Sequence, residues 1–164
     1  MTIREVLINI RERLQNAGIE DFEYESWAFL DWKLHIDRAE FYMNPNGEVK
    51  EELLAELESV LKQREQRVPL QYLMGECEFM GYDFYVDERV LIPRQDTECL
   101  VELAVEDIRN RKTQNRCESN NTADQKNEQK VKVLDLCTGS GCIGISVAKL
   151  CPDTEVTLAD ISEG

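Results

Sequence analysis

The segment that most constrains the fold of this chain is a glycine-rich stretch that joins an apolar strand to an apolar helix. It reads Val133-Leu-Asp-Leu-Cys-Thr-Gly-Ser-Gly-Cys-Ile-Gly-Ile-Ser-Val-Ala148. Glycines let a backbone turn sharply and pass close to a ligand, and the first amides of the following helix point toward that ligand. The stretch therefore predicts a strand–turn–helix unit with a nucleotide-type cofactor site. The alternative is a tight turn that binds nothing.

The residues around this stretch extend it to one parallel strand–helix–strand unit. The pattern predicts a strand over residues 131–136, a helix over 141–150 and a second strand over 155–159, and such a connection is right-handed. Asp160 follows the second strand, about 20 residues after Gly139, where an acidic side chain can accept hydrogen bonds from ribose hydroxyls. The position of Asp160 thus favours a cofactor that contains a ribose.

Asp135 distinguishes two classes of cofactor. A dinucleotide places its pyrophosphate on the helix amides, and its strand runs directly into the first glycine. Here a carboxylate stands at the carboxyl end of the strand, where it would repel a pyrophosphate. S-Adenosylmethionine carries an ammonium and a sulfonium group, so Asp135 favours this cofactor over NAD. Two roles stay open for the side chain, namely direct contact with the ligand and bracing of the loop.

Residues 2–67 have the periodicity of a small helical bundle. Thr2 and Glu5 are spaced as a capping box, and Gly18 is expected to end the first helix. Further helices are predicted over residues 23–35, 37–43 and 48–67. Apolar side chains at helical spacing are expected to form the core, namely Ile3, Val6, Leu7, Ile10, Leu14, Trp27, Leu30, Leu34, Leu53, Leu54, Leu57, Val60 and Leu61.

The hydrophobic pattern changes after Pro69. Two short alternating segments at residues 76–80 and 82–86 predict a β-hairpin. The segment that ends at Arg94 is expected to be extended, because a residue before proline avoids the helical region. A hairpin linker is therefore predicted between the helical bundle and the cofactor unit.

A helix and a loop are predicted between the hairpin and the glycine-rich stretch. Asp96 or Thr97 is placed to cap a helix that is expected to end near Arg109. Residues 110–130 are almost entirely polar and cannot bury apolar area, so they are predicted to form a mobile surface loop.

The charge of the chain is strongly acidic, at −14 from 19 basic and 33 acidic residues. Such a surface repels phosphate backbones, so no direct nucleic-acid partner is expected. It favours a basic protein partner or serves solubility alone. No apolar run approaches the roughly 18 residues of a membrane-spanning helix, so no membrane partner is expected either.

Cysteine usage indicates a reducing compartment. The six cysteines include no Cys-x-x-Cys pair, and the only histidine is His35, so no metal site is expected. The N-terminus carries charges and lacks the apolar core of an export signal. Unpaired cysteines without such a signal predict a cytoplasmic location.

With these residues identified, the chain resembles the class I S-adenosylmethionine-dependent methyltransferases. Val-Leu-Asp-Leu-Cys-Thr-Gly-Ser-Gly is similar to their first motif. Two upstream segments are similar to one branch, the HemK-type peptide-chain-release-factor glutamine N5-methyltransferases. They are Val68-Pro-Leu-Gln-Tyr-Leu-Met-Gly-Glu-Cys-Glu-Phe-Met-Gly81 and Leu91-Ile-Pro-Arg-Gln-Asp-Thr-Glu-Cys-Leu-Val-Glu102. The first motif alone is generic, whereas the Ile-Pro-Arg-x-Asp-Thr-Glu segment is specific.

The resemblance implies an α + α/β architecture in three parts. Residues 1–70 would be an N-terminal helical substrate-recognition domain, residues 71–93 a β-hairpin linker, and residues 94–164 the start of a Rossmann-like methyltransferase domain. It also implies a function, the methylation of a glutamine side-chain amide nitrogen. That glutamine lies in the Gly-Gly-Gln loop of bacterial class 1 peptide chain release factors, which would be the protein substrate.

Carried over by position, the resemblance implies a set of cofactor-binding residues. The turn would consist of Cys137, Thr138, Gly139, Ser140 and Gly141, and Asp160 would hold the ribose of S-adenosylmethionine. Cys137 stands where many members of the family have glycine, so backbone freedom is reduced there. Arg94 lies near the cofactor or substrate in the family, and a brace at the start of the next helix is the competing role.

One motif of the family is missing from residues 1–164. The family's Asn-Pro-Pro-Tyr holds the glutamine amide, and no such sequence occurs here. An amide nitrogen is a poor nucleophile, so catalysis must position it and polarise its N–H groups. No catalytic residue is therefore assigned, and this truncated chain is expected to be inactive alone. The alternative is a non-catalytic protein-binding module made of the helical domain and the hairpin.

Overall fold

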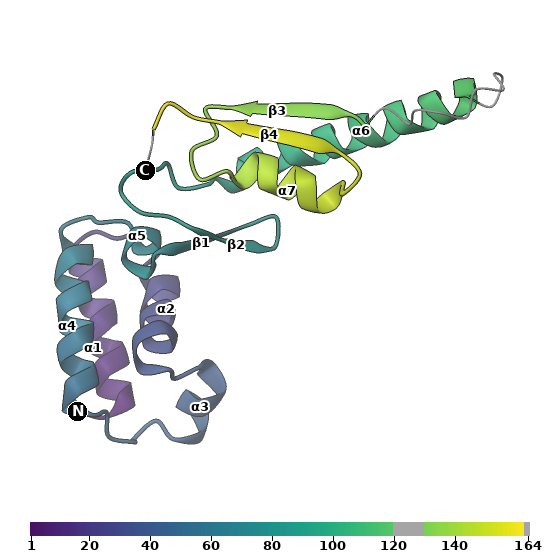
Figure 1. Ribbon diagram of the computed structural model, residues 1–164. Coiled ribbons are helices and arrows are strands. Elements are labelled where there is room, and N and C mark those ends of the chain that lie inside the picture. The colour runs from purple at the N-terminus through teal and green to yellow at the C-terminus, as the bar shows by residue number, and fades with distance from the viewer. Residues whose placement is uncertain (120–129, 163–164) are drawn as a thin grey trace. The chain divides into compact units, whose positions relative to one another are not determined.

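The computed structural model describes residues 1–119 and 130–162 of the chain (Figure 1). The chain divides into two compact units, one of residues 1–74 and one that begins at Gly75. The first unit is helical, and the second combines two strand pairs with one long and one short helix. The predicted combination of a helical region, a hairpin and a partial methyltransferase-like α/β region is confirmed.

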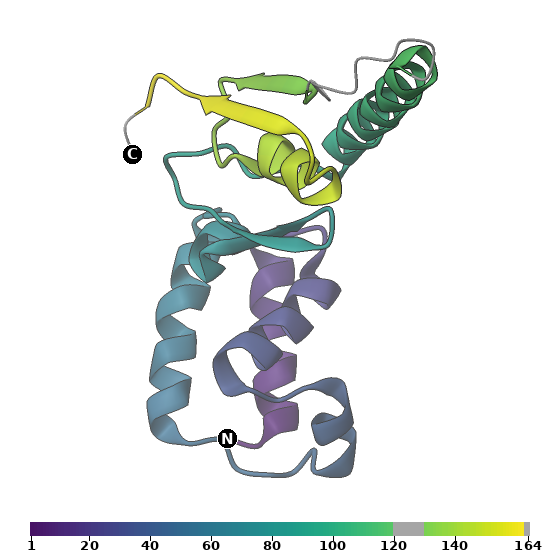
Figure 2. The ribbon, with the colours of Figure 1, turned by 45° about the vertical axis from the view of Figure 1, so that its right-hand side comes forward.

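The first unit contains five helices. They are α1 (Ile3–Asn16), α2 (Phe22–Leu34), α3 (Arg38–Met43), α4 (Glu51–Glu65) and α5 (Leu70–Met74). Both views show α1 and α4 running side by side, with α2 next to α1 (Figure 2). The four helices predicted from periodicity are present, with ends that differ by a few residues.

The ends of α1 follow the predicted signals. The Glu5 N–H donates to Thr2 Oγ1 at 3.3 Å, and the Thr2 N–H donates to the Glu5 carboxylate at 2.8 Å, which closes the capping box. Gly18 takes φ +69°, and the Ile19 N–H donates to the Leu14 carbonyl at 3.0 Å. Gly18 thus ends the helix as predicted, in a Schellman arrangement that needs a left-handed residue.

The core of the first unit is formed by the predicted apolar faces. Its fully buried side chains include Ile10, Leu14, Phe29 and Leu30. Trp27 differs from the prediction because it is only half-buried. Its ring packs edge-on against Phe41 of α3, with 5.1 Å between ring centroids, so it covers the core from outside.

Helix α5 was not predicted from the sequence. Residues 71–74 belong to this helix and to the first unit, whereas the predicted linker begins at residue 71. The Pro69 carbonyl accepts hydrogen bonds from the Tyr72 and Leu73 amides, and Leu70 is buried in the core. A single helical turn shows no periodicity in sequence, so burial of Leu70 decides its conformation.

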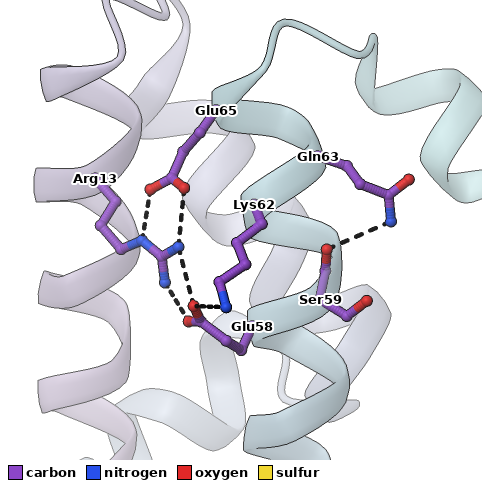
Figure 3. A network of polar contacts seen from close by, with 6 residues as sticks. All are labelled: Arg13, Glu58, Ser59, Lys62, Gln63 and Glu65. Carbon is purple, nitrogen blue, oxygen red and sulfur yellow. Dashed lines mark hydrogen bonds and ion pairs between the residues drawn. The ribbon is translucent and has the colours of Figure 1, made fainter.

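A network of ion pairs joins α1 to α4 (Figure 3). The Arg13 guanidinium donates to Glu65 at 2.7 and 3.0 Å, and it also contacts Glu58. Lys62 lies 3.3 Å from Glu58 on the exposed side. Hydrogen bonds from Arg13 are the main cause that lowers the pKa of both glutamates. The network fixes the register of the two helices at the rim of the core.

A more buried ion pair joins α2 to α4. The Arg64 guanidinium donates to both carboxylate oxygens of Glu25, at 2.7 and 2.9 Å. Only 11% of the Glu25 side chain and 12% of the Arg64 side chain are exposed. A planar two-point contact of this kind compensates part of the cost of removing both charges from water.

The second unit begins with a hairpin, β1 (Glu76–Phe79) and β2 (Tyr82–Tyr85). The strands are antiparallel and pair Phe79 with Tyr82 next to the turn. The two turn residues, Met80 and Gly81, have φ of +55° and +73°, which is typical of a two-residue hairpin turn. The predicted hairpin is present, each strand one residue shorter than expected.

The rest of the second unit forms the predicted strand–helix–strand arrangement. A short 3₁₀ turn (Gln95–Thr97) leads into α6 (Glu98–Ser119). The parallel pair of β3 (Lys132–Leu136) and β4 (Glu155–Ala159) is joined by α7 (Cys142–Leu150). Helix α7 packs on one face of the strand pair, and α6 packs against α7 (Figure 1).

The predicted loop over residues 110–130 is wrong for its first part, because α6 continues to Ser119. Polar residues sustain a helix when they pair along its surface. Arg111 forms such a pair, since it donates to Asp107 one turn earlier at 2.7 Å. The loop predicted over 120–129 lies outside the described residues. Despite the length of α6, no described helix is both long and apolar enough to cross a bilayer.

The strand pair is covered on one face only. Val133 and Val156 pair in register on the side of α7 and are half-buried. On the opposite side, 63% of Leu134 and 68% of Leu136 are exposed. The apolar strand predicted as a buried type is therefore half-open within the described residues.

Replacing Arg13 by methionine is expected to lower the free energy of unfolding of the first unit by about 0.5–1 kcal/mol at pH 7, since its partners are partly exposed. The lowered pKa of Glu58 and Glu65 means that their ionised forms stabilise the fold, and that this contribution is lost as pH falls through the lowered values. When the pH is lowered below about 4.3, the free energy of unfolding should therefore fall less in the variant than in the wild type. Urea unfolding followed by fluorescence of Trp27 and Trp32 measures both effects.

The matched control for this experiment is Lys62→Met. Lys62 is 65% exposed and, within the described residues, forms its ion pair with Glu58, so its removal should change stability and its pH dependence much less. Equal effects of the two substitutions would contradict the special role given to Arg13.

Replacing Glu25 by alanine is expected to lower the free energy of unfolding by about 3 kcal/mol, because the nearly buried Arg64 guanidinium then lacks its carboxylate partner. The double variant Glu25→Leu with Arg64→Met should recover most of this loss, since it removes both charges together. Thermal and urea unfolding of the three proteins would test the pair. A single variant as stable as the wild type would show that the pair contributes nothing.

Candidate functional site

The backbone of the glycine-rich turn follows directly from its sequence. Cys137, Gly139 and Gly141 have φ of +61°, +54° and +79°, in the left-handed region where side chains are disfavoured. The Gly141 N–H donates to the Thr138 carbonyl at 2.9 Å, and the Gly141 carbonyl accepts from the Ile145 amide at 2.9 Å. The chain thus reverses within five residues and starts α7. Cys137 adopts a backbone conformation that glycine would adopt at a lower cost.

Asp135 braces this turn from inside. Its Oδ2 accepts hydrogen bonds from Thr138 Oγ1 at 2.7 Å and from the Gly144 N–H at 2.9 Å. The second contact satisfies one of the first amides of α7, which have no partner within the helix. Of the two roles left open by the sequence, bracing is the one that these contacts support.

Asp160 holds the turn from the neighbouring strand. Its Oδ2 accepts from the Gly139 N–H at 2.8 Å, and its Oδ1 accepts from the Ser162 N–H at 2.9 Å. The amide hydrogen bonds from Ser162 and then Gly139 lower the pKa of the carboxyl, so it is ionised at neutral pH. Asp160 is exposed, and each carboxylate oxygen has a further lone pair for an added hydroxyl donor.

The glycines of the turn have different surroundings. A side-chain carbon added at Gly139 would meet nothing within 4 Å, whereas one at Gly141 would lie 2.9 Å from Ile145 Cδ1. At Gly144 it would collide with Leu158 and lie 2.9 Å from Asp135 Oδ2. Gly144 therefore allows α7 to pack closely on β4. Gly139 faces open space, as expected for the residue that a ligand approaches most closely.

A cavity of about 650 Å³ extends from this turn toward the hairpin. Gly139 and Ser140 form one side of it, and Ile145 and Lys149 of α7 continue that side. The hairpin and the loop after it form the other side with Gly81, Tyr82, Asp83, Phe84, Tyr85, Asp87, Arg89 and Val90. The cavity therefore combines a glycine turn with aromatic and charged side chains.

Three residues of the hairpin side form a small polar cluster. The Arg89 guanidinium donates to both oxygens of Asp87, at 3.0 Å from Nε and 2.6 Å from Nη2. The Tyr85 hydroxyl donates to Asp87 Oδ2 at 3.1 Å. The Arg89 side chain, as the main cause, lowers the pKa of Asp87 to about 2. The cluster keeps Asp87 ionised and orients Arg89 along the cavity wall.

The structure brings most of the predicted site residues together. Residues 137–141 form the turn, and Asp160 contacts it directly. Arg94 is not part of the turn, because it is exposed before the 3₁₀ turn and its side chain forms no hydrogen bond or ion pair within the described residues. Its carbonyl accepts from the Thr97 amide at 2.9 Å. Neither predicted role of the Arg94 side chain is supported by a contact.

Sequence reasoning missed the hairpin side of the cavity. Tyr82, Asp87 and Arg89 lie far along the chain from the turn, and no spacing rule links them to it. A signal existed for Lys149 alone. It follows Ile145 by one helical turn, so it lies on the same face of α7.

The arrangement is suited to binding rather than to acid–base catalysis. Burial is the main cause that raises the pKa of the Cys142 thiol, so this group is a protonated packing residue at neutral pH. The two carboxylates nearest the turn are occupied by backbone amides. The turn, Asp160 and the helix start fit a ligand that offers ribose hydroxyls and an open approach to Gly139, as S-adenosylmethionine does.

Two families of known proteins match separate parts of the chain. Residues 5–75 match the family described as PrmC N-terminal domain. Residues 102–164 match the family described as lysine methyltransferase. The first match covers the helical unit, and the second covers α6 and the strand–helix–strand region with the glycine turn.

Individual relatives match the chain across its whole length. A release factor glutamine methyltransferase of Clostridium acetobutylicum is 38% identical over 99% of this chain and 51% of its own length. One of Geobacter sulfurreducens is 35% identical over 99% of this chain and 51% of its own. A bifunctional methyltransferase of Rickettsia typhi is 32% identical over 98% of this chain and 31% of its own length. The chain spans about half the length of the first two of these curated relatives. The chain is thus similar over nearly its whole length to proteins named release factor glutamine methyltransferase, with one region that matches the PrmC N-terminal domain and a second that matches a methyltransferase family.

Proposed function

We propose that this protein transfers a methyl group from S-adenosylmethionine to the side-chain amide nitrogen of a glutamine. The proposed substrate is the Gly-Gly-Gln loop of a bacterial class 1 peptide chain release factor, in the cytoplasm. The observation that carries this proposal is the near-complete match of the chain to proteins named release factor glutamine methyltransferase. The braced glycine turn supports it with a site of the right chemistry.

The residues have distinct roles in this proposal. Cys137, Thr138, Gly139, Ser140 and Gly141 form the turn that contacts the cofactor, and Asp160 accepts hydrogen bonds from its ribose. The cofactor supplies the reactive methyl group. Residues 1–70 serve as the substrate-recognition domain and residues 71–93 as the linker, ahead of the methyltransferase domain from residue 94.

Glutamine is favoured over lysine as the acceptor. The family matched by residues 102–164 is described as lysine methyltransferase, and what this region contributes to the proposal is the cofactor turn. The helical unit matches the PrmC N-terminal domain, and two of the whole-length relatives are named for glutamine. Glutamine is therefore inferred as the acceptor from the combination of the helical unit with the methyltransferase region.

The proposal is tested by mapping the methylated residue. The product of the full reading frame that contains residues 1–164 is incubated with S-adenosylmethionine and a purified class 1 release factor. Peptide mass analysis should find one added methyl on the Gly-Gly-Gln glutamine. Residues 1–164 alone should give no turnover, since they contain no Asn-Pro-Pro-Tyr. Binding of the release factor without methylation by the full product would instead support a non-catalytic binding module.

Replacing Asp160 by alanine is expected to weaken S-adenosylmethionine binding at least tenfold. The change removes the acceptor for the Gly139 N–H together with the proposed ribose acceptor. Asp160→Asn retains one acceptor oxygen and should lose less. Calorimetric titration of the full product measures both.

The matched control is Asp153→Ala. Asp153 is 85% exposed, and its ion pair in the described part of the chain is with Lys112, at 3.7 Å, so its loss should leave cofactor affinity unchanged. An Asp160→Ala variant that binds as tightly as this control would remove Asp160 from the site.

A further inference from the structure

The β1–β2 hairpin is attached to both helices of its unit. At its turn, the Met80 N–H donates to the Glu98 carboxylate of α6 at 2.6 Å. On the other side, Lys149 Nζ of α7 lies 4.5 Å from the centroid of the Tyr82 ring. A cation placed over an aromatic face is attracted by the negative face of the ring. These two contacts connect the turn end of the hairpin to α6 and α7.

The hairpin also contributes to the core of the second unit. Phe79 and Phe84 are buried, with their rings edge-on at 6.2 Å between centroids. They belong to the same apolar cluster as Val101 of α6 and Val147 of α7. The apolar face of the hairpin, from Phe79 at the turn end to Phe84, is therefore fixed by burial, and Lys149 contacts Tyr82, which packs against the same cluster.

That cavity-facing side lies opposite the glycine turn. Tyr82 and Lys149 both line the cavity that contains Gly139 and Ser140. A ligand that approaches the open side of Gly139 therefore enters a space whose other wall is the hairpin. The lining carries charges of both signs, because Lys149 stands over the Tyr82 ring and Arg89 is paired with Asp87.

We propose that the β1–β2 hairpin is the outer wall of the S-adenosylmethionine pocket, and that Lys149 is a positioning residue that sets this wall through Tyr82. The inference rests on the proposed function, because it takes the glycine turn as the cofactor site. Lys149 acts through the tyrosine ring and does not contact the cofactor in this scheme. The hairpin is then a part of the cofactor site as well as a connection between two units.

Hydrogen–deuterium exchange of the full product locates the walls of the pocket. S-Adenosylmethionine at millimolar concentration should slow exchange at least threefold both at residues 137–141 and in the hairpin at residues 81–85. Slower exchange at the turn alone would overturn this inference and leave the proposed function intact. No change in either segment would overturn the cofactor assignment itself, and this inference with it.

Substitutions then test the positioning role. Lys149→Met and Tyr82→Leu should each speed hairpin exchange without cofactor and weaken cofactor binding about fivefold. Lys149→Arg keeps the cation and Tyr82→Phe keeps the ring, so both variants should retain the wild-type hairpin exchange and cofactor affinity. Lys132→Met, which removes an exposed lysine at 3.6 Å from Glu155, is the control.

Each outcome of the substitutions has one meaning. A looser hairpin with unchanged cofactor affinity would show that the contact between Lys149 and Tyr82 is structural only, which overturns the inference. Unchanged exchange and unchanged affinity in Lys149→Met, whose side chain is exposed and whose folding is not in question, would overturn it equally. Faster hairpin exchange together with weaker cofactor binding in Lys149→Met, and wild-type behaviour in Lys149→Arg, would support the inference.

Discussion

The second unit depends on the hydrogen bonds that two carboxylates accept from one glycine turn. Asp135 holds the turn and the start of α7 from β3, and Asp160 holds Gly139 from the end of β4. Without these acceptors, backbone amides at the start of α7 and in the turn would lack partners. The same hydrogen bonds shape the surface that a cofactor would contact. Structure and binding therefore share one set of atoms, and no substitution at either aspartate can affect only one of them.

The elements that depend on short sequence distances were predictable. The capping box of Thr2, the helix end at Gly18 and the strand that ends at Ala159 all follow from residues within a few positions of one another. The extent of α6 was missed because its polar part is stabilised by local pairs such as Asp107 with Arg111, which a measure of apolar content ignores. Helix α5 was missed because burial of Leu70, a tertiary effect, decides it.

In the candidate site, too, the residues placed by local sequence were predictable and those placed by tertiary packing were not. The turn and Asp160 were identified because the strand–turn–helix–strand pattern places them by its own geometry. The hairpin side of the cavity was not, since Tyr82 and Lys149 meet only after both strands have packed on α6 and α7. Predicting such a contact from sequence requires knowing the packing of the whole unit first.

The open face of the β3–β4 pair has a consequence for how the protein behaves in solution. Leu134 and Leu136 present apolar surface beside strand edges that have free backbone groups within the described residues. At low ionic strength the net charge of −14 keeps copies of the chain apart. Added salt screens the repulsion between charges more than about 10 Å apart at 0.1 M and leaves the apolar attraction intact. Colloidal stability of residues 1–164 should thus be greatest in dilute buffer.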